Sequence, residues 1–226
     1  MSDMDSCQFY CLSFKNIERR NDMVRRFNTL GIDCIFYDGV EYYTGKNMNK
    51  LLKRQWSKMH GHLDMIHHFY HNSDKTYGIF CEDDIYIHSN IRNILGKVVK
   101  DFKILNLDIL LLGYLLPYKI GTQNIYTNYK LKIDMPEDSI FKYHDYPEYH
   151  SGTQMYMISR DYAKHILDKY YDNKEIEYGV YFKCDKTIIK DGNRALIYPM
   201  LAVENYGQKD PYHQLCQQIH YNEYYI

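Results

Sequence analysis

The sequence lacks several features that would place the protein in a specialised class. No apolar run approaches the roughly 20 residues that a membrane-spanning helix needs. The net charge is only −1 at pH 7, so no overall basic charge favours nucleic acid or anionic lipid. The first residues include Asp3 and Asp5 and show no basic-then-apolar signal pattern. We therefore expect a cytoplasmic protein without a signal peptide or membrane span that binds no nucleic acid.

The sequence also lacks a Cys-x-x-Cys pair, although it contains six cysteines. Four of them lie within apolar runs, where a reduced cysteine packs as a small hydrophobic side chain. We therefore expect a reducing compartment, without structural zinc or disulfides.

Tryptophan is nearly absent, with one residue against 26 tyrosines. Tyrosine, lysine, asparagine and isoleucine have AT-rich codons, which explains the bias without an aromatic binding surface. An AT-rich microbe or a giant virus is the source that this composition suggests as a hypothesis; for a virus, the location would be the host cytoplasm or the virion.

No linker, internal repeat or low-complexity block divides the chain, so we predict one domain over residues 1–226. Apolar runs predict strands, and segments with helical spacing of apolar residues predict helices between them. The predicted strands are 8–12, 34–36, 77–81, 108–112, 153–158 and 195–198, and the predicted helices are 16–30, 47–72, 91–105, 160–170 and 184–190. This alternation indicates an α/β fold with a largely parallel sheet.

Three consecutive carboxylates, Glu82, Asp83 and Asp84, follow the predicted strand 77–81. Their mutual repulsion is unfavourable unless a cation lies nearby. Open α/β sheets bind ligands at the carboxyl ends of their strands, and hard divalent cations prefer oxygen ligands. The triplet therefore predicts a metal site, with a solvated acidic turn as the alternative.

Several segments, in chain order, resemble motifs of one enzyme family. They are Phe-Tyr-Cys-Leu at 9–12 with Glu-Arg-Arg at 18–20, Phe-Tyr-Asp-Gly-Val at 36–40, His62, Glu-Asp-Asp at 82–84, the segment 108–113, the stretch 152–163, Cys-Asp-Lys at 184–186 and Tyr-Pro at 198–199. Together they resemble glycosyltransferase family 25, which includes lipopolysaccharide-modifying sugar transferases and procollagen galactosyltransferases. Ser57, Lys58 and Gly61 depart from the Gly, Cys and Ser that the family usually has around the His62 motif.

The resemblance implies a GT-A-like fold, with a mostly parallel central sheet flanked by helices. It implies a hexosyltransferase that moves a sugar from a UDP-sugar to a hydroxyl of a glycan or protein acceptor, with inversion at the anomeric carbon. It also implies Mn²⁺ (or Mg²⁺), which would stabilise the diphosphate leaving group as a Lewis acid. Residues 1–113 would form the nucleotide-sugar half and residues 114–226 the acceptor half.

Under this resemblance, Asp84 is the expected first metal ligand and Asp83 the second, while Glu82 would bind the donor ribose or support the site. A third ligand is expected further along the chain, where His213 is our candidate and His220 stands behind it. His62 is expected as a donor-site or core histidine.

Asp185 is the candidate general base, because inversion needs a carboxylate that accepts the proton of the attacking hydroxyl. An N-cap of the predicted helix 184–190 is the equal alternative.

Donor contacts are assigned to five further residues, each beside a structural alternative. Asp38 would contact the nucleotide or form an ordinary Asp-Gly turn. Arg19 would bind the diphosphate or lie on a solvated helix face. Thr153 and Gln154 would bind donor-sugar hydroxyls, and Gly152 would allow close approach or simply open a strand.

The long irregular segment 114–150 is the expected acceptor contact, since it follows the carboxyl end of a strand. Two other functions stay open: a metal-dependent phosphoesterase or nuclease, and a catalytically silent binding protein on a transferase fold. A homodimer stays open beside a monomer.

Overall fold

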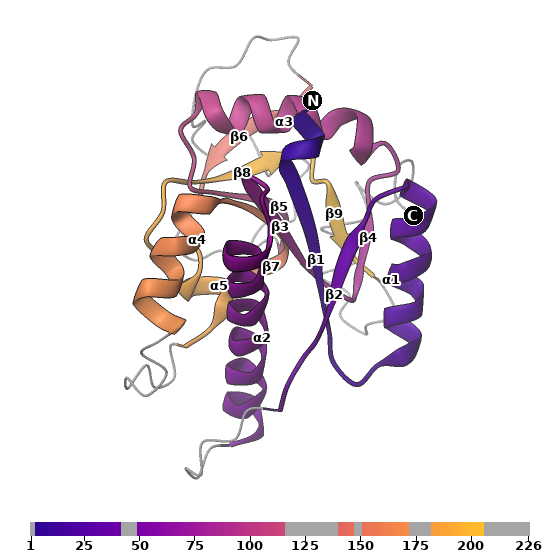
Figure 1. The fold of residues 1–226 in the computed structure, drawn as a ribbon, viewed down its shortest axis with the longest axis vertical. Coiled ribbons are helices and arrows are strands. Elements are labelled where there is room, and N and C mark those ends of the chain that lie inside the picture. The colour runs from indigo at the N-terminus through magenta and orange to yellow at the C-terminus, as the bar shows by residue number, and fades with distance from the viewer. Residues whose placement is uncertain (1–2, 42–48, 116–139, 147–150, 172–181, 206–226) are drawn as a thin grey trace, which may run out of the picture.

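A seven-stranded sheet forms the centre of the protein, with helices on both faces (Figure 1). The structure is a computed structural model that describes residues 3–41, 49–115, 140–146, 151–171 and 182–205. The strands, in their order across the sheet, are β2 (Cys34–Asp38), β1 (Cys7–Ser13), β3 (Tyr77–Glu82), β7 (Ser151–Ser159), β5 (Ile109–Leu115), β8 (Arg194–Tyr198) and β6 (Lys142–Asp145).

Five of these strands point in one direction. β1 pairs in parallel with both β2 and β3, and β5 pairs in parallel with β8. β7 is antiparallel to its two neighbours β3 and β5, so β5 points the same way as β3. β6 is antiparallel to β8 at the edge. The predicted α/β fold with a mostly parallel sheet flanked by helices is thus confirmed.

The helices form two layers around this sheet. They are α1 (Ile17–Leu30), α2 (Lys50–Asn72), α3 (Ile91–Ile104), α4 (Arg160–Ile166) and α5 (Cys184–Thr187), with a 3₁₀ turn η1 (Asp3–Ser6) and a π-helical turn η3 (Leu167–Tyr171). One hydrophobic core joins α2, α4 and α5 to one face of the sheet, and a second joins α1 and α3 to the other. A small sheet of β4 (Ile85–Ile87) and β9 (Ala202–Glu204) adds to the second core.

Local sequence explains where the two helices nearest the site begin. Asn16 caps α1 by accepting a hydrogen bond from the backbone N of Arg19 at 3.0 Å, and Asn49 caps α2 through the backbone N of Leu52 at 2.9 Å. α1 ends at Gly31, whose φ of 62° is the left-handed conformation that glycine adopts readily. Both helices therefore form close to the predicted bounds.

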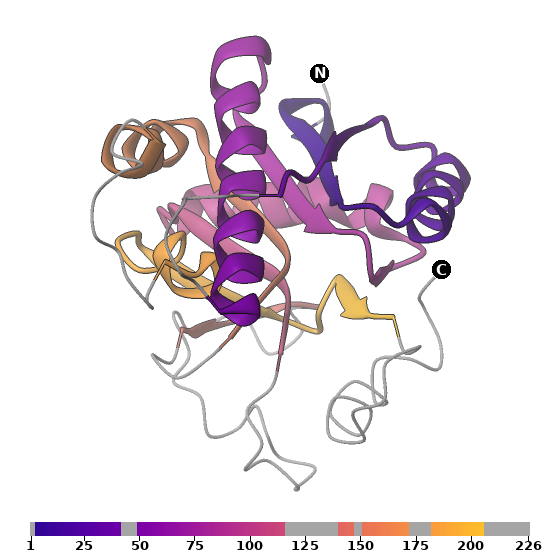
Figure 2. The same cartoon turned by 90° about the horizontal axis from the view of Figure 1, so that it is seen from below.

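α2 lies tightly against the sheet because Gly61 has no side chain. A Cβ at Gly61 would lie 2.7 Å from the Cδ1 atom of Leu12 near the end of β1. This close approach brings the middle of α2 over the carboxyl ends of β1 and β3. α5 lies beside α2 in both views (Figures 1 and 2). Lys58 of α2 can therefore reach both β3 and α5.

Some elements were not predicted from the sequence, namely η1, β4, β6 and β9. β7, from the predicted acceptor half, lies between two strands of the predicted nucleotide half. Most of the predicted acceptor segment 114–150 lies outside the described residues. None of the helices in the described ranges is long and apolar enough to cross a membrane.

Candidate active site

A cavity opens at the carboxyl ends of β1, β2 and β3, where the sequence places the acidic triplet. Its volume is about 480 Å³. It is lined by Leu12, Phe14, Asn16, Arg19, Gly39, Val40, Glu41, Lys50, Lys53, Arg54, Ser57, Lys58, Glu82, Asp83 and Asp84. One wall is basic and comes mainly from the first half of α2. The acidic triplet lines the same cavity, and Lys58 of α2 contacts Glu82.

The three carboxylates of the triplet do not converge on one point. Glu82 is the last residue of β3, and its side chain lies toward α2 and α5. Asp83 and Asp84 follow the strand and lie toward Ser13 and Arg19. The triplet thus divides between two adjacent groups of side chains.

The first group joins Glu82 to Asp185 through Lys58 and Thr153. Lys58 Nζ lies 2.6 Å from Glu82 Oε1 and 3.7 Å from Asp185 Oδ1. The Thr153 hydroxyl lies 3.2 Å from Glu82 Oε1 and 2.9 Å from Asp185 Oδ1. Residues from α2, β3, β7 and α5 therefore meet in one hydrogen-bonded cluster.

Burial and charge set the ionisation of this cluster. Burial raises the pKa of Glu82 to about 7, although Lys58 opposes the shift. Burial also disfavours the carboxylate form of Asp185, but the Lys58 ammonium and the Thr153 hydroxyl hold its pKa below the ordinary value. Asp185 is therefore ionised at neutral pH. Burial disfavours the charged form of Lys58, yet its acidic neighbours, among them Glu82, hold its pKa well above the ordinary value.

The second group joins Asp83 and Asp84 to Arg19. Arg19 Nη1 lies 3.1 Å from Asp84 Oδ2 and 3.7 Å from Asp83 Oδ1. The Ser13 hydroxyl donates to Asp83 Oδ2 at 2.7 Å. Burial raises the pKa of Asp83, and the hydrogen bond from Ser13 partly offsets that shift.

The structure places His62 in the core beside the first group. Its side chain is fully buried, and its Nδ1 lies 2.9 Å from the Tyr156 hydroxyl. Burial lowers the pKa of His62 to about 3, with Lys58 adding to the shift. Of the two expected roles, this position favours a core histidine.

The other predicted donor residues have different surroundings. Thr153 belongs to the cluster described above. Gln154 is buried, and its Oε1 atom has no hydrogen-bond partner among the described residues. Gly152 has a φ of 115°, which side-chain-bearing residues rarely adopt. Asp38 is 86% exposed, pairs with Arg20, and does not line the cavity, although Gly39 does.

A divalent ion fits the second group through its chemistry. Two carboxylates already converge on one positively charged nitrogen, and their oxygens are hard ligands. No group of three or more His, Cys, Asp or Glu side chains arranged for a metal occurs within the described ranges. His213 and His220, the predicted further ligands, lie outside those ranges. Asp83 and Asp84 are thus the described residues that would hold an ion.

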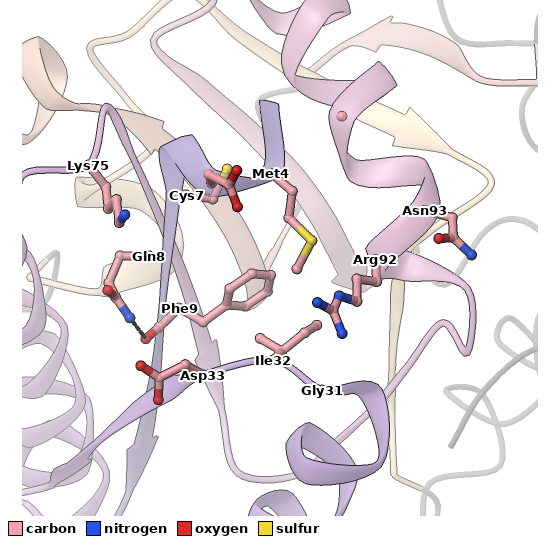
Figure 3. Close-up of a pocket in the computed structure, with 12 residues that line it drawn as sticks. Met4, Cys7, Gln8, Phe9, Gly31, Ile32, Asp33, Lys75, Arg92 and Asn93 are labelled. Carbon is pink, nitrogen blue, oxygen red and sulfur yellow. Dashed lines mark hydrogen bonds between the residues drawn. The ribbon is translucent and has the colours of Figure 1, made fainter. Parts of the chain in front are cut away.

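A second cavity lies at the amino ends of β1 and β2 (Figure 3). Its volume is about 570 Å³, and its lining includes Phe9, Asp33 and Arg92. It contains none of the predicted site residues. Because ligands of open α/β sheets bind at the carboxyl ends of strands, we place the candidate active site at the cavity of the triplet.

Lys58 and Ser13 were missed as site residues. Lys58 stands where the family usually has cysteine, and a lysine on a half-buried helix position between Trp56 and His62 breaks the apolar pattern. That break is the signal that could have identified it. Ser13 carries no such signal.

The candidate site lies at the carboxyl ends of the strands, where open α/β folds bind their ligands. Residues 7–186 match the model of glycosyltransferase family 25 (LPS biosynthesis protein), so the chain belongs to this family and is a glycosyltransferase. The resemblance stated from the sequence motifs is thereby confirmed.

Three solved structures are similar to the chain at low sequence identity. A glycosyltransferase involved in the glycosylation of the major capsid of PBCV-1 is 11% identical, with 94% of this chain and 99% of that chain covered and a TM-score of 0.46. HddC from Yersinia pseudotuberculosis is 12% identical, with 94% and 78% covered and a TM-score of 0.40. A protein of STIV is 10% identical, with 84% and 80% covered and a TM-score of 0.44. No curated protein matches the sequence significantly.

Proposed function

We propose that the protein transfers a hexose from a UDP-sugar to a hydroxyl group of a glycan or protein acceptor, with inversion at the anomeric carbon. Mn²⁺ or Mg²⁺ would assist the reaction. One observation carries the proposal: Asp185 shares the cation Lys58 with Glu82, and Lys58 and Glu82 line the cavity together with Asp83 and Asp84. A general base and the group that binds the diphosphate must lie close together, because both act on the same anomeric carbon.

Asp185 would act as the general base. Its pKa lies below the ordinary value, so it is ionised at neutral pH and can accept a proton from the acceptor hydroxyl. The acceptor oxygen would attack the anomeric carbon while the bond from that carbon to the diphosphate breaks. Lys58 and Thr153 would hold the Asp185 carboxylate in place during attack.

The leaving diphosphate would be stabilised beside Asp83 and Asp84. A divalent ion held by Asp83 and Asp84 would supply Lewis-acid stabilisation when bound. Arg19 and the basic side chains of α2, Lys53 and Arg54, line the same cavity and would attract phosphate oxygens.

Two carboxylate variants test this assignment. Asp185→Asn should abolish sugar transfer but keep UDP binding, because it removes only the proton acceptor. Asp84→Asn should abolish metal-dependent UDP binding, because it removes a ligand. Asp168→Asn is the control, since Asp168 is exposed and pairs with Lys164.

The measurements are a thermal-shift assay with Mn²⁺ and UDP and a hydrolysis assay across several UDP-sugars. Full transfer by Asp185→Asn would show that another group is the base. Absence of a thermal shift with every nucleotide and metal would contradict the donor assignment and favour a silent binding protein.

The remaining expectations rest on the same proposal. We propose that residues 114–150 contact the acceptor and that the protein acts in the cytoplasm. We also propose a homodimer, which light scattering would distinguish from a monomer. His213 is proposed as a third ligand, which His213→Ala would test through Mn²⁺ affinity.

A further inference from the structure

Arg19 is held in a fixed place beside the two expected metal ligands. It lies in the first turn of α1, where its backbone N donates to the side chain of the cap Asn16. Its side chain crosses to the end of β3 and is 32% exposed, while Asp83 and Asp84 are 13% and 21% exposed. The pair of carboxylates therefore has a cation within the chain itself.

A divalent ion and this guanidinium compete for the same oxygen atoms. Arg19 Nη1 donates to Asp84 Oδ2 at 3.1 Å, and the same nitrogen lies 3.7 Å from Asp83 Oδ1. An ion bound by both carboxylates would lie close to these oxygens, where the positive charge of the guanidinium opposes it. We infer that Arg19 occupies the cation position of the Asp83–Asp84 pair, and that metal and nucleoside diphosphate bind cooperatively because the diphosphate accepts the guanidinium that the metal displaces.

The inference rests on the proposed function and adds how metal binding and diphosphate binding are coupled at the site. A displaced guanidinium that stays partly buried without an anionic partner is unfavourable. Arg19 lines the same cavity as Lys53 and Arg54, which is where the diphosphate of a donor would lie. An arginine fork matches two phosphate oxygens, so the diphosphate offers Arg19 a replacement for Asp84.

This competition has a measurable consequence for metal affinity. Metal binding without nucleotide is weakened by the displacement of Arg19, whereas metal binding with nucleotide is not. Coupling between two ligands is reciprocal and is typically about 5–150-fold. We expect UDP to raise the Mn²⁺ affinity of the wild-type protein by a factor in this range.

The test uses Arg19→Gln in the full chain, with Mn²⁺ affinity measured by titration calorimetry or electron paramagnetic resonance, with and without UDP. Arg19→Gln should bind Mn²⁺ alone at least about 5-fold more tightly than the wild type, and its coupling to UDP should fall toward 1. Arg20→Gln is the matched control, because it removes the same charge from the next residue but Arg20 pairs with Asp38. Arg19→Lys, which keeps the charge, should retain weak metal binding.

The outcomes separate this inference from the proposed function. Mn²⁺ binding that is unchanged or weaker in Arg19→Gln than in wild type overturns the competition, even where transfer activity is normal. An equal gain in Arg20→Gln also overturns it, since the effect is then one of net charge. Absence of Mn²⁺ binding in both the wild type and Arg19→Gln overturns the inference together with metal dependence. If the wild type shows the coupling between Mn²⁺ and UDP but transfers no sugar, only the proposed function is contradicted.

Discussion

Removal of the Lys58 ammonium should destabilise the folded protein in a pH-dependent way. The substitution Lys58→Met keeps an unbranched side chain that is one atom shorter and removes its charge. Lys58 lies 2.6 Å from Glu82 and 3.7 Å from Asp185, and the three side chains are only 21–29% exposed. The variant would therefore leave two half-buried carboxylates without their shared cation.

The magnitude follows from these distances. At an effective dielectric constant of about 20, the two attractions are about 6 and about 4 kcal/mol before desolvation is subtracted. Desolvation offsets most of this, and removal of one partner from a buried pair typically costs about 3–5 kcal/mol. Because solvent reaches part of each side chain, we expect the free energy of unfolding to fall by about 2–3 kcal/mol at pH 8.

The loss should shrink at low pH. Glu82 already has a raised pKa of about 7, and without Lys58 its pKa in the folded protein rises further above the ordinary 4.5. When the pKa of a carboxyl group is higher in the folded than in the unfolded protein, stability falls as pH rises from the unfolded pKa to the folded pKa. The destabilisation at pH 5 should therefore be smaller than at pH 8.

Urea unfolding of the variants at both pH values provides the measurement. Glu82→Gln added to Lys58→Met should restore part of the lost stability, because it removes one unpaired carboxylate. Lys164→Met is the control, since Lys164 is exposed and its pair with Asp168 should contribute little to stability. A loss below about 0.5 kcal/mol in Lys58→Met, or an equal loss at both pH values, would refute the reasoning.

Two further predictions concern the core. The pKa of His62 is about 3 in the folded protein against an ordinary 6.5, so the stability that the neutral imidazole contributes is present above pH 6.5 and is lost as pH falls. Between pH 7 and pH 5, the free energy of unfolding of the wild type should therefore fall by about 2 kcal/mol more than that of His62→Gln. Urea unfolding of both proteins measures this difference. A Cβ at Gly113 would meet the Ala202 carbonyl oxygen at 2.7 Å, so Gly113→Ala should lower stability by about 1–3 kcal/mol. Gly61→Ala, which meets only the movable end of Leu12 and gains helix propensity, should change it less, and thermal melts that rank the two in the opposite order would contradict this reading.

Most of the fold could be predicted from the sequence because its signals are local. Single residues mark the helix ends, namely Asn16 and Asn49 at the starts of α1 and α2 and Gly31 at the end of α1. The apolar run at 77–81 can likewise be recognised without knowledge of a distant partner. The antiparallel direction of β7 could not be predicted, because strand direction depends on pairing with β3 and β5, which lie far away in the sequence. The short strands β4 and β9 were missed because neither has a pattern without the other.

The sequence offered candidate site residues but not their arrangement. Glu82, Asp83, Asp84 and Asp185 were all selected, and the structure brings them to one edge of the sheet. The sequence could not reveal that Glu82 faces a different side from its two neighbours, since that depends on where β3 ends. It also could not reveal Lys58 as their partner, because the contact joins residues on separate elements.

The balance of charge explains why both internal cations matter. Four carboxylates meet two cations, Lys58 and Arg19, within the contacts described for this edge. When all four carboxylates are ionised, four negative charges against two positive charges leave an excess of two, which equals the charge of one divalent ion. Burial raises the pKa of Glu82 to about 7, and the charges of Asp84 and Asp185 add to the shift, so a proton is favoured there. An arriving divalent ion should therefore release protons from the site, and a proton-release measurement in two buffers of different ionisation enthalpy tests that consequence directly.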